Sequence, residues 1–149
     1  MESLLVCILI FILGIAFLLY SIYCYKKSKD SEKWSKTKGQ ISKAYMGEFT
    51  DSNSVSYKAE IEYSYNVADK VYNSKRKYYA DHLLSSSYWS TKKLVDKYRV
   101  GDTIDVYYNP QYPKDAVLEQ GVHFSVIAFF IVSLVCLSIG GVLIERFYL

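Results

Sequence analysis

The chain has 149 residues, a formal net charge of +3 and a mean hydropathy of +0.03, so its average composition is that of a soluble protein. A charge this small does not by itself indicate a nucleic-acid-binding protein. The average conceals two abrupt changes, because the apolar residues gather at both ends and nearly all the charge lies between Lys26 and Gly121. The end segments also hold all three cysteines, which excludes a disulfide scaffold in the middle.

The first apolar segment, Ser3 to Tyr25, carries no charge. At 1.5 Å per residue a helix of this length crosses a hydrocarbon core of about 30 Å. A cleaved signal peptide is the alternative, but only Glu2 stands where a basic cluster is expected, and the apolar run is too long. The sequence therefore predicts a transmembrane helix over residues 1–25.

The second apolar segment, Val122 to Ile144, is also long enough to cross and leaves residues 145–149 as a short tail. Neither segment has an ionisable side chain in its interior, which argues against transport. Several small residues could allow the two helices to pack against each other or, as a weaker option, to oligomerise: Gly14, Ser133, Cys136, Gly140 and Gly141.

Basic residues crowd the exit of the first helix, whereas only Arg146 follows the second. The positive-inside rule then places residues 26–121 in the cytoplasm and both termini outside. The alternative reading of the lysine run is a contact with anionic lipid, but such a run primarily sets topology, and lipid binding would be a by-product. The juxtamembrane basic group consists of Lys26, Lys27, Lys29 and Lys33.

The clearest strand of the middle segment is Val55 to Val67, where apolar and polar residues alternate without a break. A short connection at Ala68-Asp69-Lys70 leads into Val71 to Tyr79, the antiparallel partner of a hairpin. Upstream, Lys38 to Tyr45 is a plausible first strand, and Asp51 to Ser54 makes the turn.

Downstream the period changes to helical spacing over Tyr88 to Tyr98, with Ser85 to Ser87 as N-cap candidates. A strand over Thr103 to Asn109 follows, and Ala116 to Leu118 can pair as an edge strand. This order predicts a membrane protein with two transmembrane helices flanking a small α+β, mostly β domain. The domain is either an antiparallel sheet or a partly open SH3-like or OB-like barrel, with one short helix.

A family resemblance rests on a succession of motifs: Trp34, Gly39 with Ile41, Ile61-x-Tyr63-x-Tyr65-x-Val67, Tyr72, Tyr98-x-x-Gly101, Ile104 to Pro113 and Ala116 to Glu119. The chain resembles the bacterial family known as domain of unknown function 3592, most specifically over Val106 to Pro113. The resemblance implies a protein of the bacterial cytoplasmic (inner) membrane with a β-rich module between transmembrane helices, and it implies no activity. Ala68-Asp69-Lys70 stands where a glycine is expected, which puts the turn type in question.

Two sets of residues suggest chemistry weakly. One set suggests nucleophilic chemistry: His82 with Asp81 and the Ser85 to Ser87 cluster. The sequence around it has no nucleophile-elbow motif, and the domain has no second histidine, so the serines are more simply helix-capping residues. Asp102 and Asp105 are more simply turn and solvent-face groups than an acid–base pair. We expect no catalytic, cofactor or metal site, and no enzyme.

The run Lys75-Arg76-Lys77-Tyr78-Tyr79 is similar to patches that bind single-stranded nucleic acid. Half-buried strand tyrosines beside solvated lysines explain it equally well, and the small net charge disfavours nucleic acid as a partner.

The last candidate is a proline-rigidified turn that could serve as a recognition loop. Its residues are Asn109, Pro110, Tyr112 and Pro113. We therefore expect a non-enzymatic interaction module anchored in the lipid bilayer, which binds a protein partner or forms a homo-oligomer. The alternatives are an immunity or exclusion protein against a membrane-active toxin and, ranked below it, a membrane-associated hydrolase or accessory enzyme subunit.

Overall fold

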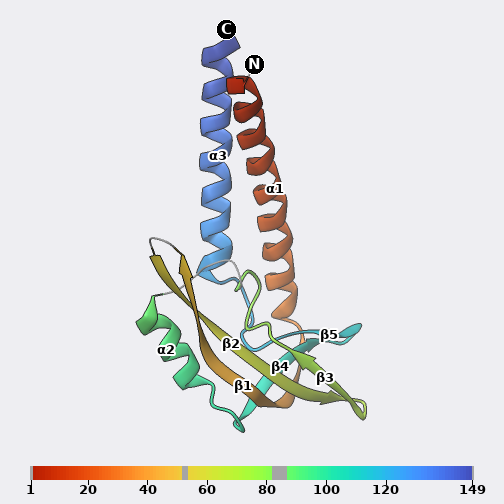
Figure 1. Ribbon diagram of the computed structural model, residues 1–149. Coiled ribbons are helices and arrows are strands. Elements are labelled where there is room, and N and C mark those ends of the chain that lie inside the picture. Colours follow the sequence, from red (N-terminus) through yellow and green to blue (C-terminus); the bar gives the residue numbers. More distant parts are fainter. Residues whose placement is uncertain (1, 52–53, 82–86, 149) are drawn as a thin grey trace. The chain divides into compact units, whose positions relative to one another are not determined.

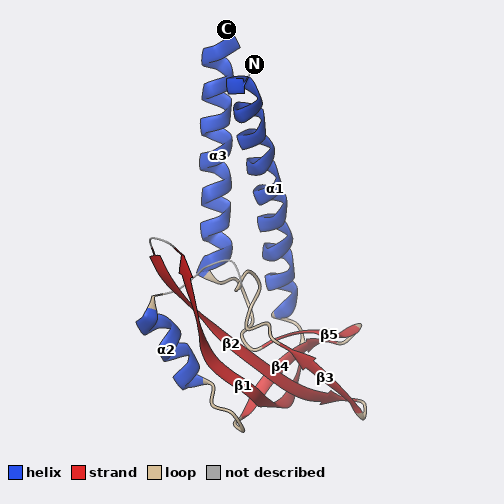
Figure 2. Cartoon of the chain, viewed as in Figure 1, coloured by secondary structure: helices blue, strands red, loops and turns tan. Residues whose placement is uncertain are grey.

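The computed structural model describes residues 2–51, 54–81 and 87–148, drawn in Figures 1 and 2. The elements in chain order are α1 (Glu2–Ser31), β1 (Ser35–Asp51), β2 (Ser54–Val67), β3 (Lys70–Ser74), α2 (Tyr88–Lys97), β4 (Thr103–Asn109), β5 (Tyr112–Val117) and α3 (Phe124–Tyr148). The chain divides into two compact units, residues 1–27 with 122–149 and residues 28–121.

The first unit pairs the two long apolar helices, which lie side by side in Figure 1 with the chain ends together. Stretches within both, Leu5–Ser31 and Phe124–Arg146, are long and apolar enough to cross a membrane. Both helices start or end beyond the predicted spans. α1 continues past Tyr25 to Ser31, and α3 begins at Phe124 and runs to Tyr148 through the predicted tail.

Small residues let α1 and α3 approach closely. A Cβ atom on Gly14 would lie 3.0 Å from the side chain of Leu137, and one on Gly140 would lie 3.3 Å from Phe11. Two of the predicted small residues are therefore at the helix contact, whereas a Cβ on Gly141 would meet nothing within 4 Å. Because early residues of α1 meet late residues of α3, the helices are antiparallel.

The second unit is a five-stranded antiparallel sheet in the order β3-β2-β1-β4-β5. β1 is the central strand, and a bulge between Ile41 and Lys43 interrupts its register with β2. The edge strands β3 and β5 approach each other but are not paired in the described sheet. The sheet is open, so the barrel alternative is wrong and the predicted antiparallel sheet with one short helix is confirmed.

The core lies on the face of the sheet that α2 covers (Figure 2). The alternation predicted for β2 holds in its middle, where Ile61, Tyr63 and Tyr65 are at most 3% exposed. α2 contributes the buried Thr91 and packs Leu94 against the same cluster. Burial of these large apolar and aromatic groups is the main favourable term in folding the unit.

The structure shows which type of turn joins β2 and β3 where the sequence lacks the expected glycine. Val67 pairs with Lys70, which leaves Ala68 and Asp69 as a two-residue loop with φ values of 50° and 61°. Positive φ at both central residues is the signature of a type I′ turn, which suits the twist of a hairpin. The turn type that favours glycine is therefore made without one.

Several strand boundaries differ from the predicted ones, and β1 (Ser35–Asp51) extends beyond the predicted Lys38 to Tyr45 at both ends. β3 ends at Ser74, so the prediction of a strand to Tyr79 is wrong for Lys75 to Tyr79, which leave the sheet. The partly buried positions of β3 are Tyr72 and Ser74, whereas Lys77 and Tyr79 are the buried ones after it, so the inward-facing phase shifts by one residue and a regular strand cannot continue. β5 begins at Tyr112, several residues before the predicted Ala116, and accommodates Pro113 because it is an edge strand.

Gly39 lies where three strands meet, paired with Tyr65 on β2 and Ile104 on β4. We predict that Gly39→Ala destabilises the protein by about 1 to 3 kcal/mol, as overpacked cores do. The added Cβ would lie 2.6 Å from Val106 Cγ2 and 2.7 Å from the Ser64 carbonyl oxygen. Thermal unfolding of the detergent-solubilised chain, followed by circular dichroism, measures the loss.

The matched control is Gly47→Ala on the same strand. Its Cβ would come no closer than 3.4 Å to Phe49, an ordinary contact, so this variant should keep or slightly raise the unfolding temperature. Equal losses in both variants would contradict the role given to Gly39.

Candidate functional site

The described domain has a polar pocket where β3 stops and β2 continues with only β1 paired to it. It has a volume of about 360 Å³ and is lined by residues 58–61 of β2, residues 74–77 and Asp81. The chain reaches this position because the β2–β3 pairing covers only Tyr63 to Val67, and the segment after Ser74 then folds across the uncovered part of β2.

Lys77 lines this pocket, and its side chain is only 7% exposed. Its Nζ lies 3.4 Å from Asp81 Oδ2 and donates to the Ala59 carbonyl oxygen at 3.3 Å. Asp81 Oδ2 also accepts the Lys77 N–H at 2.9 Å. A buried ammonium requires such an opposite charge and hydrogen-bond acceptors, so these contacts hold the segment in place.

The backbone of Lys77 joins the pocket to the chain after β5. Its carbonyl oxygen accepts the N–H groups of Leu118 at 2.9 Å and Glu119 at 2.8 Å. The Lys77 ammonium donates to the carbonyl oxygen of Ala59, which lies on β2 beyond the end of β3. Farther along β2, Thr91 Oγ1 donates to the carbonyl oxygen of Tyr57 at 3.4 Å. Side chains thus occupy a strand edge that would otherwise be open to another strand.

Arg76 makes a second ion pair on the other side of the segment. Its guanidinium pairs with the Asp115 carboxylate, which also accepts the Tyr79 hydroxyl at 2.7 Å. The guanidinium carbon lies 4.8 Å from the centre of the Tyr79 ring, a cation–π contact, and Trp34 meets that ring edge-on at 6.2 Å. The Arg76 carbonyl oxygen accepts the hydroxyl of buried Tyr63 at 2.8 Å.

Lys75 completes a set of three consecutive pairs. Its Nζ lies 2.7 Å from Glu62 Oε1, and Lys43 lies 3.2 Å from Oε2 of the same carboxylate. Lys75 and then Lys43 hold the pKa of Glu62 below its usual range. Each cation of the Lys75 to Lys77 triplet therefore faces a carboxylate, so the structure does not present the triplet as a free basic patch.

The acid–base candidates occupy structural positions. Asp102 accepts the Arg99 N–H at 3.2 Å in a turn, and Asp105 lies 2.7 Å from both Lys36 and Lys38. Hydrogen bonds from Lys36 and then Lys38 hold the pKa of Asp105 below its usual range.

The proposed nucleophile set is only partly visible. His82, Ser85 and Ser86 lie outside the described residues. Ser87 is the N-cap of α2, but its hydroxyl meets that of Ser90 at 2.9 Å and makes no side-chain capping bond. Within residues 2–51, 54–81 and 87–148 no group of three or more histidine, cysteine, aspartate or glutamate side chains could hold a metal ion.

The predicted recognition loop is shorter than expected. Asn109 pairs with Tyr112, so only Pro110 and Gln111 form the turn, and Tyr112 and Pro113 belong to β5. The turn is fixed at both ends, because Asn109 Oδ1 accepts the Gln111 N–H at 2.9 Å and the Pro113 carbonyl oxygen accepts the Tyr65 hydroxyl at 2.5 Å. Tyr112 is 69% exposed on this rigid support.

The juxtamembrane lysines separate into two groups. Lys26, Lys27 and Lys29 lie on α1 and Lys33 in the turn after it, with Lys29 3.1 Å from Glu32. The lysines farther along the run lie on β1 and pair with carboxylates of the sheet: Lys36, Lys38 and Lys43.

Sequence reasoning missed an aromatic cluster, which we define as Tyr57, Tyr88 and Trp89. The Tyr88 ring meets Tyr57 edge-on at 5.4 Å and Trp89 edge-on at 5.5 Å. Trp89 is 75% exposed. The helical spacing could have indicated that Trp89 is exposed, because Trp89 does not lie on the face of the helix where Leu94 and Val95 pack against the core.

These features define a class: an open antiparallel sheet with one helix, carried by two apolar helices that could anchor it in a membrane. Residues 37–123 match the family model described as Domain of unknown function (DUF3592). The match covers more than half of the chain, so the protein belongs to this family, as its motifs indicated. A comparison with curated proteins yields no match.

We predict that Lys77→Met costs about 3 to 5 kcal/mol of stability, because it leaves the buried Asp81 carboxylate without its ammonium. The double variant Lys77→Met/Asp81→Asn should lose less than Lys77→Met alone. The control Lys75→Met removes an exposed cation and should have little effect. Unfolding temperatures of the detergent-solubilised variants test this, and a double variant less stable than Lys77→Met would contradict it.

Buried tyrosines should make the domain sensitive to alkali. Burial, and then the nearby Asp115 carboxylate, raises the pKa of Tyr65 from 10.0 to about 12, and burial with Glu119 does the same for Tyr98. Above pH 10 the unfolded chain releases these protons while the folded chain retains them, so stability falls between pH 10 and 12.

Tyr65→Phe or Tyr98→Phe should make that fall less steep, although each variant starts less stable because it loses a hydrogen bond. Unfolding temperatures measured from pH 8 to 12 give the slopes. Slopes parallel to that of the unsubstituted protein would contradict the assignment.

Proposed function

We propose that this protein is a membrane-anchored, non-enzymatic interaction module whose domain binds a protein partner on the cytoplasmic side. The observation that carries the proposal is the aromatic cluster, in which exposed Trp89 on α2 contacts Tyr88 of the same helix, and Tyr88 contacts Tyr57 of β2. Tryptophan and tyrosine are the residues that most often anchor protein interfaces, because they bury large areas at low entropic cost.

The surroundings of the cluster indicate the chemistry of the partner. Lys92 lies 6.0 Å from the centre of the Tyr88 ring, and Lys92 and Lys93 are both exposed on α2. An apolar partner surface with an acidic rim fits this arrangement, with the aromatic rings supplying affinity and the lysines orienting the encounter. Tyr112, which is exposed at the start of β5 beside the fixed Pro110-Gln111 turn, is a second and separate aromatic surface.

The pairing of the polar groups supports a binding role. Asp81, which would assist His82 in a hydrolase, is engaged by the ammonium and the N–H of Lys77. The cations that suggested nucleic-acid binding are each matched by a carboxylate. An immunity or exclusion protein is a special case of the proposal, in which the partner is a membrane-active toxin.

Photo-crosslinking in the native membrane tests the proposal. A benzophenone amino acid placed at Lys93 should give one reproducible protein adduct, whereas the same probe at Val100, which is 64% exposed, should not. Trp89→Ala, combined with the probe at Lys93, should reduce the adduct at least tenfold, since a central interface tryptophan is worth about 2 kcal/mol or more. Tyr112→Ala in the same background shows whether the turn contributes.

The identity of the captured protein tests the predicted sidedness and the immunity alternative. A cytoplasmic or inner-leaflet partner supports the predicted sidedness, and a partner exposed only outside contradicts it. A toxin selects the immunity alternative. Absence of an adduct from the probe at Lys93 and from a second probe placed at Tyr112, in proteins with an unchanged unfolding temperature, would contradict the proposal.

A further inference from the structure

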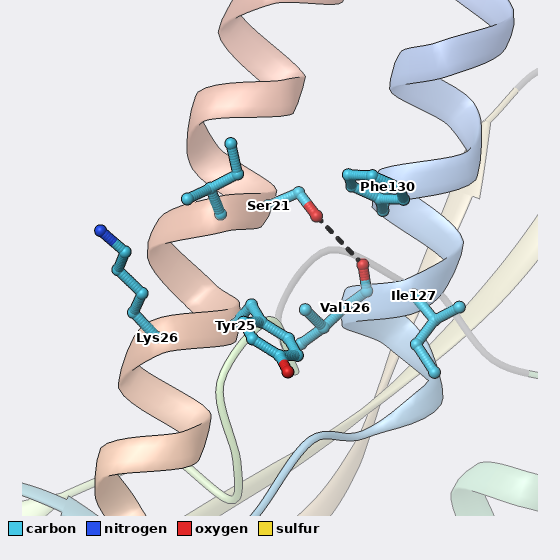
Figure 3. A pocket seen from close by; sticks show the side chains of 7 residues that line it. Ser21, Tyr25, Lys26, Val126, Ile127 and Phe130 are labelled. Atoms are coloured by element: carbon cyan, nitrogen blue, oxygen red, sulfur yellow. Dashed lines mark hydrogen bonds between the residues drawn. The ribbon is translucent and has the colours of Figure 1, made fainter.

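The helix unit uses its small residues within one chain. Gly14 and Gly140 lie at the contact between α1 and α3, and Ser133 is buried. Figure 3 shows the Ser21 hydroxyl donating to the Val126 carbonyl oxygen across the same pair of helices, at 3.2 Å. These residues hold α1 and α3 of one chain together and do not face a second chain.

The domain, in contrast, leaves one long strand edge without a partner among the described residues. β1 pairs with β4 only over Ser35 to Gln40, and the backbone of Ile41 still bonds to the turn before β4. Past that point β1 and β2 continue together as a two-stranded ribbon (Figure 2). Lys77 and Thr91 occupy the β2 edge of this ribbon, whereas no described element bonds to its β1 edge. We call residues 44–50 of this second edge the free edge of β1.

The backbone groups of the free edge point outward. Lys77 follows β3 and bonds the Ala59 carbonyl oxygen on that side of β2, so this carbonyl points away from β1. In an antiparallel ladder both members of such a pair direct their N–H and C=O groups away from each other, and the β1 partner of Ala59 is Met46. Strand alternation extends this to every second residue. The residues that present N–H and C=O groups to the free edge are Ala44, Met46, Glu48 and Thr50.

The free edge has little of the protection that sheet edges usually carry. Residues 44–50 contain no proline and a single charge, Glu48, and the bulge of β1 lies before them. The face opposite to the core carries Tyr45 and Phe49, which are 54% and 56% exposed. Gly47 lies between these two aromatic residues on the same face. The edge is therefore accessible to an added strand.

We propose that two copies of the chain pair β1 with β1 along the free edge, antiparallel and centred on Gly47, which joins their five-stranded sheets into one. The two-fold axis then pairs Met46 with Glu48 of the second copy and Ala44 with Thr50 of the second copy. All four residues direct N–H and C=O groups outward, so each pair exchanges two hydrogen bonds.

The order of side chains along the strand selects a second copy as the occupant. This register sets Tyr45 opposite Phe49 of the second copy in a non-hydrogen-bonded pair, where cross-strand side chains lie closest. It also sets Lys43 opposite Asp51, so residues of opposite charge are paired at both ends of the ladder. Gly47 meets itself at the axis, where no side chain is in the way. A shift by two residues sets Lys43 opposite Phe49 or Tyr45 opposite Asp51 and loses both matches. A strand that complements itself in this way meets the requirement of a two-fold interface.

Cysteine crosslinking of the full chain in its membrane tests the register, in a background without the native thiols. Gly47→Cys should form a disulfide between copies on oxidation, because the Cα atoms of such a pair lie about 4.5 Å apart. Tyr45→Cys should not, because the two copies of that position lie roughly 13 Å apart along the ladder. Tyr45→Cys/Phe49→Cys should crosslink again, because the register sets the two positions opposite each other. The background carries Cys7→Ser, Cys24→Ser and Cys136→Ser.

Light scattering of the full chain in a non-ionic detergent measures the dimer itself. Met46→Pro should weaken dimerisation by about tenfold or more, because symmetry removes two ladder hydrogen bonds. Its unfolding temperature should hold, since this N–H does not bond to β2 and proline is tolerated at a strand edge. Met46→Ala removes the same side chain, keeps the N–H and should remain dimeric.

Three results overturn the proposal. The first is an unsubstituted chain that is monomeric at every concentration measured, and the second is a dimer that Met46→Pro leaves unchanged. The third is a crosslinked yield for Tyr45→Cys that equals the yield for Gly47→Cys. If Met46→Pro does not fold, the cysteine variants decide the question.

Discussion

The domain depends on one buried ammonium. Without Lys77 Nζ, the Ala59 carbonyl at the uncovered part of β2 and the Asp81 carboxylate would both lack a partner that the structure gives them. The same residue accepts two backbone N–H groups from the chain after β5, so the end of the domain is fixed to its middle. A short edge strand can therefore be followed by an irregular segment without leaving the sheet open to aggregation.

The buried tyrosines explain how so small a domain keeps distant segments together. Their rings fill the core, and their hydroxyls each reach a different part of the chain: Tyr63 donates to the Arg76 carbonyl, Tyr65 to that of Pro113, and Tyr98 to the Glu119 carboxylate. A phenylalanine core of equal volume would supply the apolar burial but none of these links. The tyrosines thus let a small core both bury apolar surface and hold distant segments of the chain together.

Periodic signals predicted the elements, and non-local contacts decided what the sequence could not show. The alternation from Val55 to Val67 located β2, and the apolar runs located both long helices. In contrast, Lys77 has the local appearance of a solvated strand lysine, and only the Asp81 and Ala59 contacts bury it. Pro113 was assigned to a turn, because its position on the edge strand β5 was not visible in the sequence. For the site, the turn at Tyr112 was predicted but the aromatic cluster was not, since its partners come from separate elements.

The unequal lengths of the strands give the domain an internal gradient of local stability. β1 pairs with β4 only from Ser35 to Gln40, and β2 pairs with β3 only from Tyr63 to Val67, while the two long strands continue together to Asp51 and Ser54. The far end of this hairpin is therefore supported by fewer neighbouring strands than its base. In a single chain, amide hydrogens at that end are therefore expected to exchange through local opening more readily than those at the base, which β3 and β4 border.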